Sequence, residues 1–212
     1  MLTFKAFSAL LSYPSQELRQ ALPEIADVIR GSPLVKAREC QGLLDLIDEL
    51  GQGELLDAEQ RYVDLFDRGR ALSLHLFEHL HGDGRDRGQA MVELKQLYER
   101  AGFDLTATEL PDYLPVVLEY LSVRKMDEAR DMLIDCAHIL TSIARSLLAR
   151  QSRYAAVPQA LLVMAGEQPV DGAKVAPVRE RLETMDRDWA EQPAFGVDAA
   201  SPVGIPAAPG RI

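Results

Sequence analysis

Three histidines and a glutamate within seven residues are the side chains best placed to do chemistry. His75 and His79 are four residues apart, so on a helix they would share one face and could bind a metal ion, with His81 as a further ligand. Glu78 directly precedes His79, whereas the glutamate of the HExxH zinc-protease motif directly follows the first histidine. The favoured interpretation is ordinary helix-surface histidines. A metal-dependent helical hydrolase that uses His75, His79 and His81 is the alternative.

Other catalytic patterns are missing from the sequence. A helical metal-dependent phosphohydrolase would need more histidine and aspartate ligands, and only His138, which no aspartate follows, remains. There is no GxSxG, P-loop or GxGxxG pattern, and Cys40 and Cys136 lack the helix start or basic cluster that activates a thiol. We therefore expect reduced, buried cysteines, no catalytic residues, no bound metal and no cofactor.

Charge and composition indicate the kind of partner. Among 212 residues, 33 are acidic and 23 basic, and this formal charge of −10 would repel nucleic acid and anionic membranes. A neutral or basic partner is favoured, and a basic amphipathic peptide would be attracted by this field. The N-terminal residues lack a signal-peptide pattern, and no apolar run approaches about 18 residues. We expect a cytoplasmic protein.

The elements that position these residues are predicted to be helices. Apolar residues recur at helical spacing in most of the chain, and no segment shows sustained strand alternation. The prediction is an all-α fold, a single compact bundle of about eight to ten helices spanning residues 1–192. Residues 193–212, rich in proline, glycine and alanine, are predicted to be a disordered tail. The predicted helices are 2–11, 15–31, 40–50, 55–66, 72–80, 90–101, 114–121, 128–150, 157–165 and 178–189.

Several of these boundaries have a specific residue behind them. Ser15 can cap the second helix, and Pro23 is expected to kink it. Gly102 sits where a left-handed cap ends the helix before it, and Pro115 falls in a first helical turn, where proline is tolerated. The segment 128–150 has one broad apolar stripe and is expected to be an unbroken central helix.

Two aromatic segments are more informative than the histidines. Residues 62–66 (YVDLF) end one helix just before a charged loop, and residues 109–115 (ELPDYLP) begin another. Taken alone, the first is ordinary core, and the second is a helix start with Asp112 near the positive end of the helix dipole. The second interpretation of 109–115 is a rigid corner that lines a groove.

Together with residues 10–14 (LLSYP) and 73–82 (SLHLFEHLHG), these segments resemble the nitrate reductase molybdenum cofactor assembly chaperones. This is the NarJ-type or delta-subunit family, within the wider TorD- and DmsD-like redox enzyme maturation chaperones. The resemblance covers residues 3–165. It implies an all-α chaperone, not an enzyme, whose groove binds the N-terminal segment of the apo catalytic subunit of nitrate reductase until molybdenum cofactor and iron–sulfur insertion are complete.

The resemblance also implies which residues bind that peptide. Tyr62, Leu65 and Phe66 match the aromatic-x-x-Leu-Phe motif, and Pro111, Asp112 and Tyr113 match a proline-aspartate-histidine motif in which tyrosine replaces the histidine. An aromatic wall with a hydrogen-bonding tip would survive that replacement. The candidate acidic contacts are Asp64, Glu78, Asp112 and Glu119. The full set of expected peptide-binding residues is Tyr62, Leu65, Phe66, Phe77, Glu78, His81, Pro111, Asp112, Tyr113 and Glu119.

The hypothesis therefore names a partner and keeps alternatives. The partner is the apo catalytic subunit of nitrate reductase, with the cofactor-delivery machinery as a further candidate partner. Within the same family, the client could instead be another molybdenum enzyme. An amphipathic helix laid into an apolar groove is held by anchors worth about 1.5 to 3 kcal/mol each when fully buried.

Overall fold

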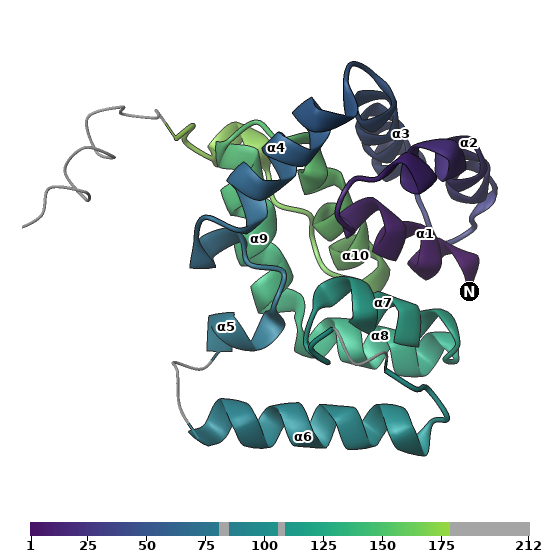
Figure 1. Ribbon diagram of the computed structural model, residues 1–212, viewed down its shortest axis with the longest axis vertical. Coiled ribbons are helices and arrows are strands. Elements are labelled where there is room, and N and C mark those ends of the chain that lie inside the picture. Colours follow the sequence, from purple (N-terminus) through teal and green to yellow (C-terminus); the bar gives the residue numbers. More distant parts are fainter. Residues whose placement is uncertain (81–84, 106–108, 179–212) are drawn as a thin grey trace, which may run out of the picture. The chain divides into compact units, whose positions relative to one another are not determined.

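The computed structural model describes residues 1–80, 85–105 and 109–178, and these residues confirm the all-α prediction (Figure 1). An isolated bridge between His75 and Tyr113 is the one β-type pairing in the described ranges. Three short 3-10 helices join the α-helices: η1 (Arg70–Leu72), η2 (Arg153–Ala155) and η3 (Gly172–Lys174). The α-helices are α1 (Leu2–Leu11), α2 (Gln16–Gly31), α3 (Ala37–Gly51), α4 (Leu55–Phe66), α5 (Leu76–Leu80), α6 (Arg85–Arg100), α7 (Leu114–Ser122), α8 (Met126–Asp135), α9 (Ala137–Ala149) and α10 (Ala156–Ala165).

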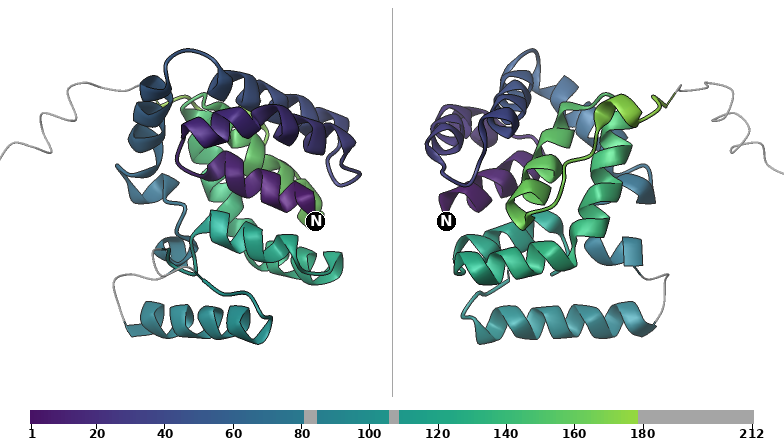
Figure 2. Two further views of the ribbon diagram at one scale, coloured as in Figure 1. Left: turned by 45° about the vertical axis from the view of Figure 1, so that its right-hand side comes forward. Right: turned by 180° about the vertical axis from the view of Figure 1, so that it is seen from behind.

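The core forms around α1 and α10. Helix α1 packs against α2 and α7, while α10 packs against α3, α8 and α9 (Figures 1 and 2). Phe4, Phe7 and Leu10 of α1 are fully buried, and each contributes about 1.5 to 3 kcal/mol through burial. The Ser8 hydroxyl donates a 2.8 Å hydrogen bond to the Pro115 carbonyl, which ties α1 to the first turn of α7. This link positions the segment that precedes α7.

Helix α6 lies beyond α7 and α8 in all three views (Figures 1 and 2). Tyr98 anchors it: the buried ring packs on Tyr120 and Phe103, and the hydroxyl donates to the Pro111 carbonyl at 2.8 Å. Gly102, with φ of 71°, follows the end of this helix as predicted. The anchor therefore ties α6 to the 111–113 segment.

The predicted unbroken helix 128–150 is wrong. Helices α8 and α9 meet at Cys136 with a bend of 67°. Both halves pack on α10, and the Arg130 Nε donates to the Ala165 carbonyl at the end of α10 at 3.2 Å. The bend lets each half bury its own apolar face. Since neither proline nor glycine marks the break, the sequence carried no local signal for it.

Other predictions are corrected in detail or fall outside the description. The helix predicted over 72–80 is two short ones, η1 and α5, with an extended segment between them. Helix α2 runs through Pro23 without interruption. The cysteines are free and half-buried, and burial raises the pKa of Cys136 to about 11. The helix predicted over 178–189, the domain boundary at 192, the tail 193–212 and His81 lie outside the described residues.

Among the described residues, no single helix is long and apolar enough to cross a membrane. Helices α8 and α9 reach the required length and composition only as a pair, across the bend at Cys136.

Candidate functional site

Parts of two motif segments predicted from the sequence, 73–82 and 109–115, lie against each other. His75 and Tyr113 form the antiparallel bridge, with the Leu76 N–H donating to the Asp112 carbonyl at 3.0 Å. The Leu114 N–H donates to the Leu74 carbonyl at 2.8 Å. Residues 36 or more positions apart are therefore joined by their backbones, and their side chains form one site.

Asp112 is the centre of this junction. Its side chain is 0% exposed, its Oδ2 accepts the Phe77 N–H at 3.0 Å, and its Oδ1 lies 3.3 Å from His75 Nδ1. The hydrogen bond to this carboxylate is the main cause that raises the pKa of His75. A buried carboxylate is tolerated only when such donors surround it. Asp112 thus fixes the chain that leads into α5.

Two tyrosine hydroxyls connect this junction to α4 and α1. The Tyr62 hydroxyl donates to the Leu11 carbonyl at 2.8 Å and lies 2.9 Å from the Tyr113 hydroxyl. Because Tyr62 has only one proton to give, the Tyr113 hydroxyl is the donor in the second bond. The Tyr113 ring packs on the His75 ring at 5.2 Å between centroids. Burial raises the pKa of both tyrosines, which keeps them as neutral hydrogen-bonding groups.

The aromatic cluster contains two members that are not among the predicted peptide-binding residues. The Tyr62 and Phe66 rings pack with their centroids 4.8 Å apart, and the Tyr154 ring of η2 packs edge-on against Phe66 with 5.1 Å between centroids. Tyr13 packs edge-on against Tyr62 at 5.6 Å from the connection between α1 and α2. Tyr13 ends one helical pattern and Tyr154 falls between two others, so neither belongs to a periodic stripe.

A solvent-open cavity of about 460 Å³ lies beside this cluster, between the end of α4 and the start of α5. We call it the α4–α5 cavity. Glu78 at its rim pairs with Arg87 at 3.1 Å, and hydrogen bonding to Ser73 is the main cause that lowers the pKa of Glu78. Phe66 is the apolar member of a lining that is otherwise mostly polar or charged. The lining residues are Phe66, Asp67, Arg68, Gly69, Arg70, Ser73, His75 and Glu78.

The structure brings most of the predicted peptide-binding residues to this region. Tyr62, Phe66, Pro111 and Asp112 are buried; Tyr113, Phe77 and Glu78 are half-buried next to the cavity or the bridge.

Three other predicted residues have different surroundings. Leu65 is half-buried on α4, and Glu119 is exposed on α7 and does not line the cavity. Asp64 pairs with Arg68 at 3.1 Å.

The predicted arrangement of the histidines is wrong. His75 lies in the extended segment before α5, so it does not share a helix face with His79. Its Nδ1 faces Asp112, while His79 Nε2 lies 2.9 Å from the Ser73 carbonyl oxygen. Within the described residues no three His, Cys, Asp or Glu side chains are grouped to hold a metal ion.

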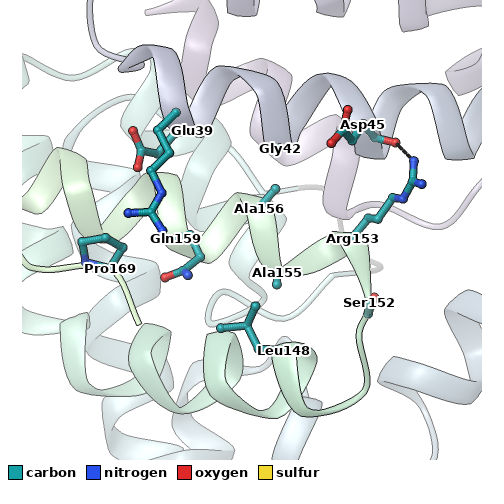
Figure 3. A pocket seen from close by; sticks show the side chains of 11 residues that line it. Glu39, Gly42, Asp45, Leu148, Ser152, Arg153, Ala155, Ala156, Gln159 and Pro169 are labelled. Carbon is teal, nitrogen blue, oxygen red and sulfur yellow. Dashed lines mark hydrogen bonds between the residues drawn. The ribbon is translucent and has the colours of Figure 1, made fainter. Parts of the chain in front are cut away.

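A second cavity, of about 250 Å³, lies where α3 faces η2 and α10 (Figure 3). Gly42 allows α3 and α10 to approach each other, since a Cβ at this position would lie 3.4 Å from the Ala156 Cβ. Arg153 Nη1 donates to the Asp45 carbonyl at 2.9 Å across one end. No predicted peptide-binding residue lines this cavity.

The His75–Asp112 pair predicts a pH dependence of stability. Because the pKa of His75 is raised in the folded chain, protonated His75 contributes to the free energy of unfolding. This contribution is complete below the ordinary pKa of 6.5 and is lost as the pH rises through the folded-state pKa. The free energy of unfolding, from urea titrations, should therefore fall more steeply in the wild type than in His75→Gln as the pH rises above 6.5. Equal pH profiles for the two proteins would contradict this role for His75.

Comparisons with known proteins bear on the family of this chain. The family model described as nitrate reductase delta subunit matches residues 13–157, a span that runs from Tyr13 past Tyr154. The nitrate reductase molybdenum cofactor assembly chaperone NarJ of Escherichia coli K12 is 43% identical over 188 residues, which are 89% of this chain and 78% of that protein. NarW of the same strain, named as a probable chaperone of the same kind, is 38% identical over 197 residues, covering 91% of this chain and 82% of its own.

A crystal structure shares the fold. It is that of a candidate redox enzyme maturation protein from Archaeoglobus fulgidus, with a TM-score of 0.53 at 22% identity, covering 77% of this chain and 92% of that one. The family match over most of the chain, together with these relatives, identifies the chain as a member of the nitrate reductase delta subunit family.

Proposed function

We propose that this protein is a cytoplasmic assembly chaperone for the molybdenum cofactor of a nitrate reductase. It acts without catalysis by holding the N-terminal segment of the apo catalytic subunit while molybdenum cofactor and iron–sulfur centres are inserted. The observation that carries the proposal is the 43% identity over 188 residues to a chaperone named for this task. The cofactor-delivery machinery is a second partner that this role would bring to the complex.

The geometry of the site supports capture of a peptide. The α4–α5 cavity is open, and it lies beside an aromatic cluster in which the Tyr62 hydroxyl donates to the Leu11 carbonyl and meets the Tyr113 hydroxyl. Three or four apolar anchors at about 1.5 to 3 kcal/mol each, less the ordering of the peptide, give roughly −8 kcal/mol, a micromolar affinity. Such binding is strong enough to recruit a client and weak enough to release it.

Calorimetric titration tests the proposal. The probe is the N-terminal peptide of the nitrate reductase catalytic subunit from the same organism, and the wild type should bind it with micromolar affinity. Tyr113→Ala should weaken binding about tenfold, while Tyr113→Phe keeps the ring and should bind within about threefold of the wild type. A wild-type chain that releases no heat and gains no thermal stability with this peptide would contradict the proposed function.

A competing client is tested in the same experiment. N-terminal peptides from other molybdenum enzymes of the organism are titrated in parallel. Tighter binding of one of these would assign the chaperone to that enzyme instead.

A further inference from the structure

The proposed peptide site has an exposed aromatic edge. Tyr13 is 50% exposed, yet its ring packs on Tyr62, whose hydroxyl meets that of Tyr113. The ring of Tyr113 in turn packs on His75, which lines the α4–α5 cavity. We call Tyr13, Tyr62 and Tyr113 the tyrosine strip. It leads from solvent to the cavity, and its outer ring is held by a buried neighbour.

Two carboxylates flank the strip. Glu109 directly precedes Leu110, whose carbonyl accepts the Tyr113 N–H at 3.1 Å, so its side chain starts at the turn that leads into Tyr113. Asp67 follows the last residue of α4, and the charges of both carboxylates add to burial in raising the pKa of Tyr113. Asp67 also lines the α4–α5 cavity. Both side chains are exposed, and neither has an ion-pair or side-chain hydrogen-bond partner among the residues that the structure describes.

The neighbouring carboxylates differ in this respect. Asp64 pairs with Arg68, Glu78 with Arg87, and Asp112 with His75. The acidic residues singled out from the sequence at this site are therefore largely neutralised within the chain. Within the described ranges, Asp67 and Glu109 are the carboxylates beside the strip that form no ion pair.

We propose that the tyrosine strip, with Asp67 and Glu109 at its edge, selects a client helix that carries an apolar face followed by a lysine or arginine. The apolar face packs on the exposed ring of Tyr13 and the half-buried ring of Tyr113, while the buried ring of Tyr62 supports both from below. The aliphatic stem of the basic residue lies along Tyr113 and its cation reaches the two carboxylates. The formal charge of −10 favours the approach of such a peptide. This inference rests on the proposed function and names the chemistry that the same site recognises.

Calorimetry with the full chain tests the inference. One probe is a peptide of about 18 residues, about five helical turns, from the N-terminus of the nitrate reductase catalytic subunit. The other is the same peptide with its lysines and arginines replaced by glutamine. Tyr13→Ala is compared with Ile134→Ala, which removes an apolar side chain of similar exposure (44%) from α8. The double variant Asp67→Asn/Glu109→Gln is compared with Glu24→Gln/Asp48→Asn, which removes the same charge from exposed positions on α2 and α3.

Tyr13→Ala should weaken binding of the unmodified peptide about tenfold, and Ile134→Ala should change it less than about twofold. The Asp67/Glu109 variant should bind the unmodified peptide about tenfold more weakly than the wild type at low salt, with a smaller difference at high salt. It should also lose the preference for the unmodified peptide over the glutamine peptide. The Glu24/Asp48 variant should keep that preference. All six substituted positions are exposed, so melting temperatures near that of the wild type are expected.

The outcomes separate the inference from the proposed function. If the wild type binds the unmodified peptide but Tyr13→Ala and the Asp67/Glu109 variant bind it equally well, the strip is not the recognition surface and the chaperone role stands. If the wild type binds the unmodified peptide and the glutamine peptide equally well, the basic residue is not recognised. If the wild type does not bind the peptide at all, the proposed function fails, and the inference fails with it.

Discussion

Replacement of Asp112 by alanine should lower the free energy of unfolding by about 3 kcal/mol. The carboxylate is fully buried, and it accepts the Phe77 N–H while facing His75 Nδ1. Alanine would leave a backbone donor and an imidazole without their acceptor and would open a hole under the bridge between His75 and Tyr113. Urea titration followed by circular dichroism measures the change directly.

Two comparisons make this prediction specific. Asp112→Asn keeps an acceptor for the Phe77 N–H but removes the charge, so it should be less damaging than alanine and should lower the pKa of His75, measured by NMR. Asp64→Ala removes an exposed carboxylate paired with Arg68 and should change stability by less than about 1 kcal/mol. If Asp112→Ala were as mild as Asp64→Ala, the carboxylate would not be what holds the two motif segments together.

Tyr62→Ala should lower the free energy of unfolding by about 4 kcal/mol. This ring contacts Tyr13, Phe66 and Tyr154, and its hydroxyl bonds to the Leu11 carbonyl and to Tyr113. Its removal would take away the common neighbour of the cluster and would detach α4 from the end of α1. The measurement is again equilibrium unfolding in urea.

The variant Tyr62→Phe separates the ring from the hydroxyl. It should lose only about 1 kcal/mol, because it keeps the packing and leaves the Leu11 carbonyl without this donor. It should also keep most of the affinity for the client peptide. A loss from Tyr62→Phe as large as that from Tyr62→Ala would show that the hydroxyl network, and not ring packing, dominates here.

Local pattern was sufficient for most of the helices. The apolar spacing of α2, α3 and α4 is visible in the sequence because each helix buries one face, and Gly102 marked a helix end because its backbone needs a positive φ. The bend at Cys136 was not visible. A 3.6-residue period continues across a bend, and the reason for this one is the packing of both halves on α10.

The motif residues were recognisable, but their roles depend on pairing between distant segments. A continuous helix over 72–80 would place His75 and His79 on one face. The bridge to Tyr113, formed across 37 intervening residues, makes 73–75 extended instead. The same contact buries Asp112. A residue predicted as a contact for the partner is thus engaged inside the chain.

By itself, the sequence determined the all-helical class, the acidic charge and the motifs at 62–66 and 109–115, because these depend on residue type and on spacing within a turn or two of helix. The tertiary structure alone decided which carboxylates are neutralised and which aromatic rings meet. It paired Asp64, Glu78 and Asp112 and left Asp67 and Glu109 without partners among the described residues. It also brought Tyr13 and Tyr154 to Tyr62. Burial and charge pairing arise from segments far apart in the chain, so no local pattern encodes them.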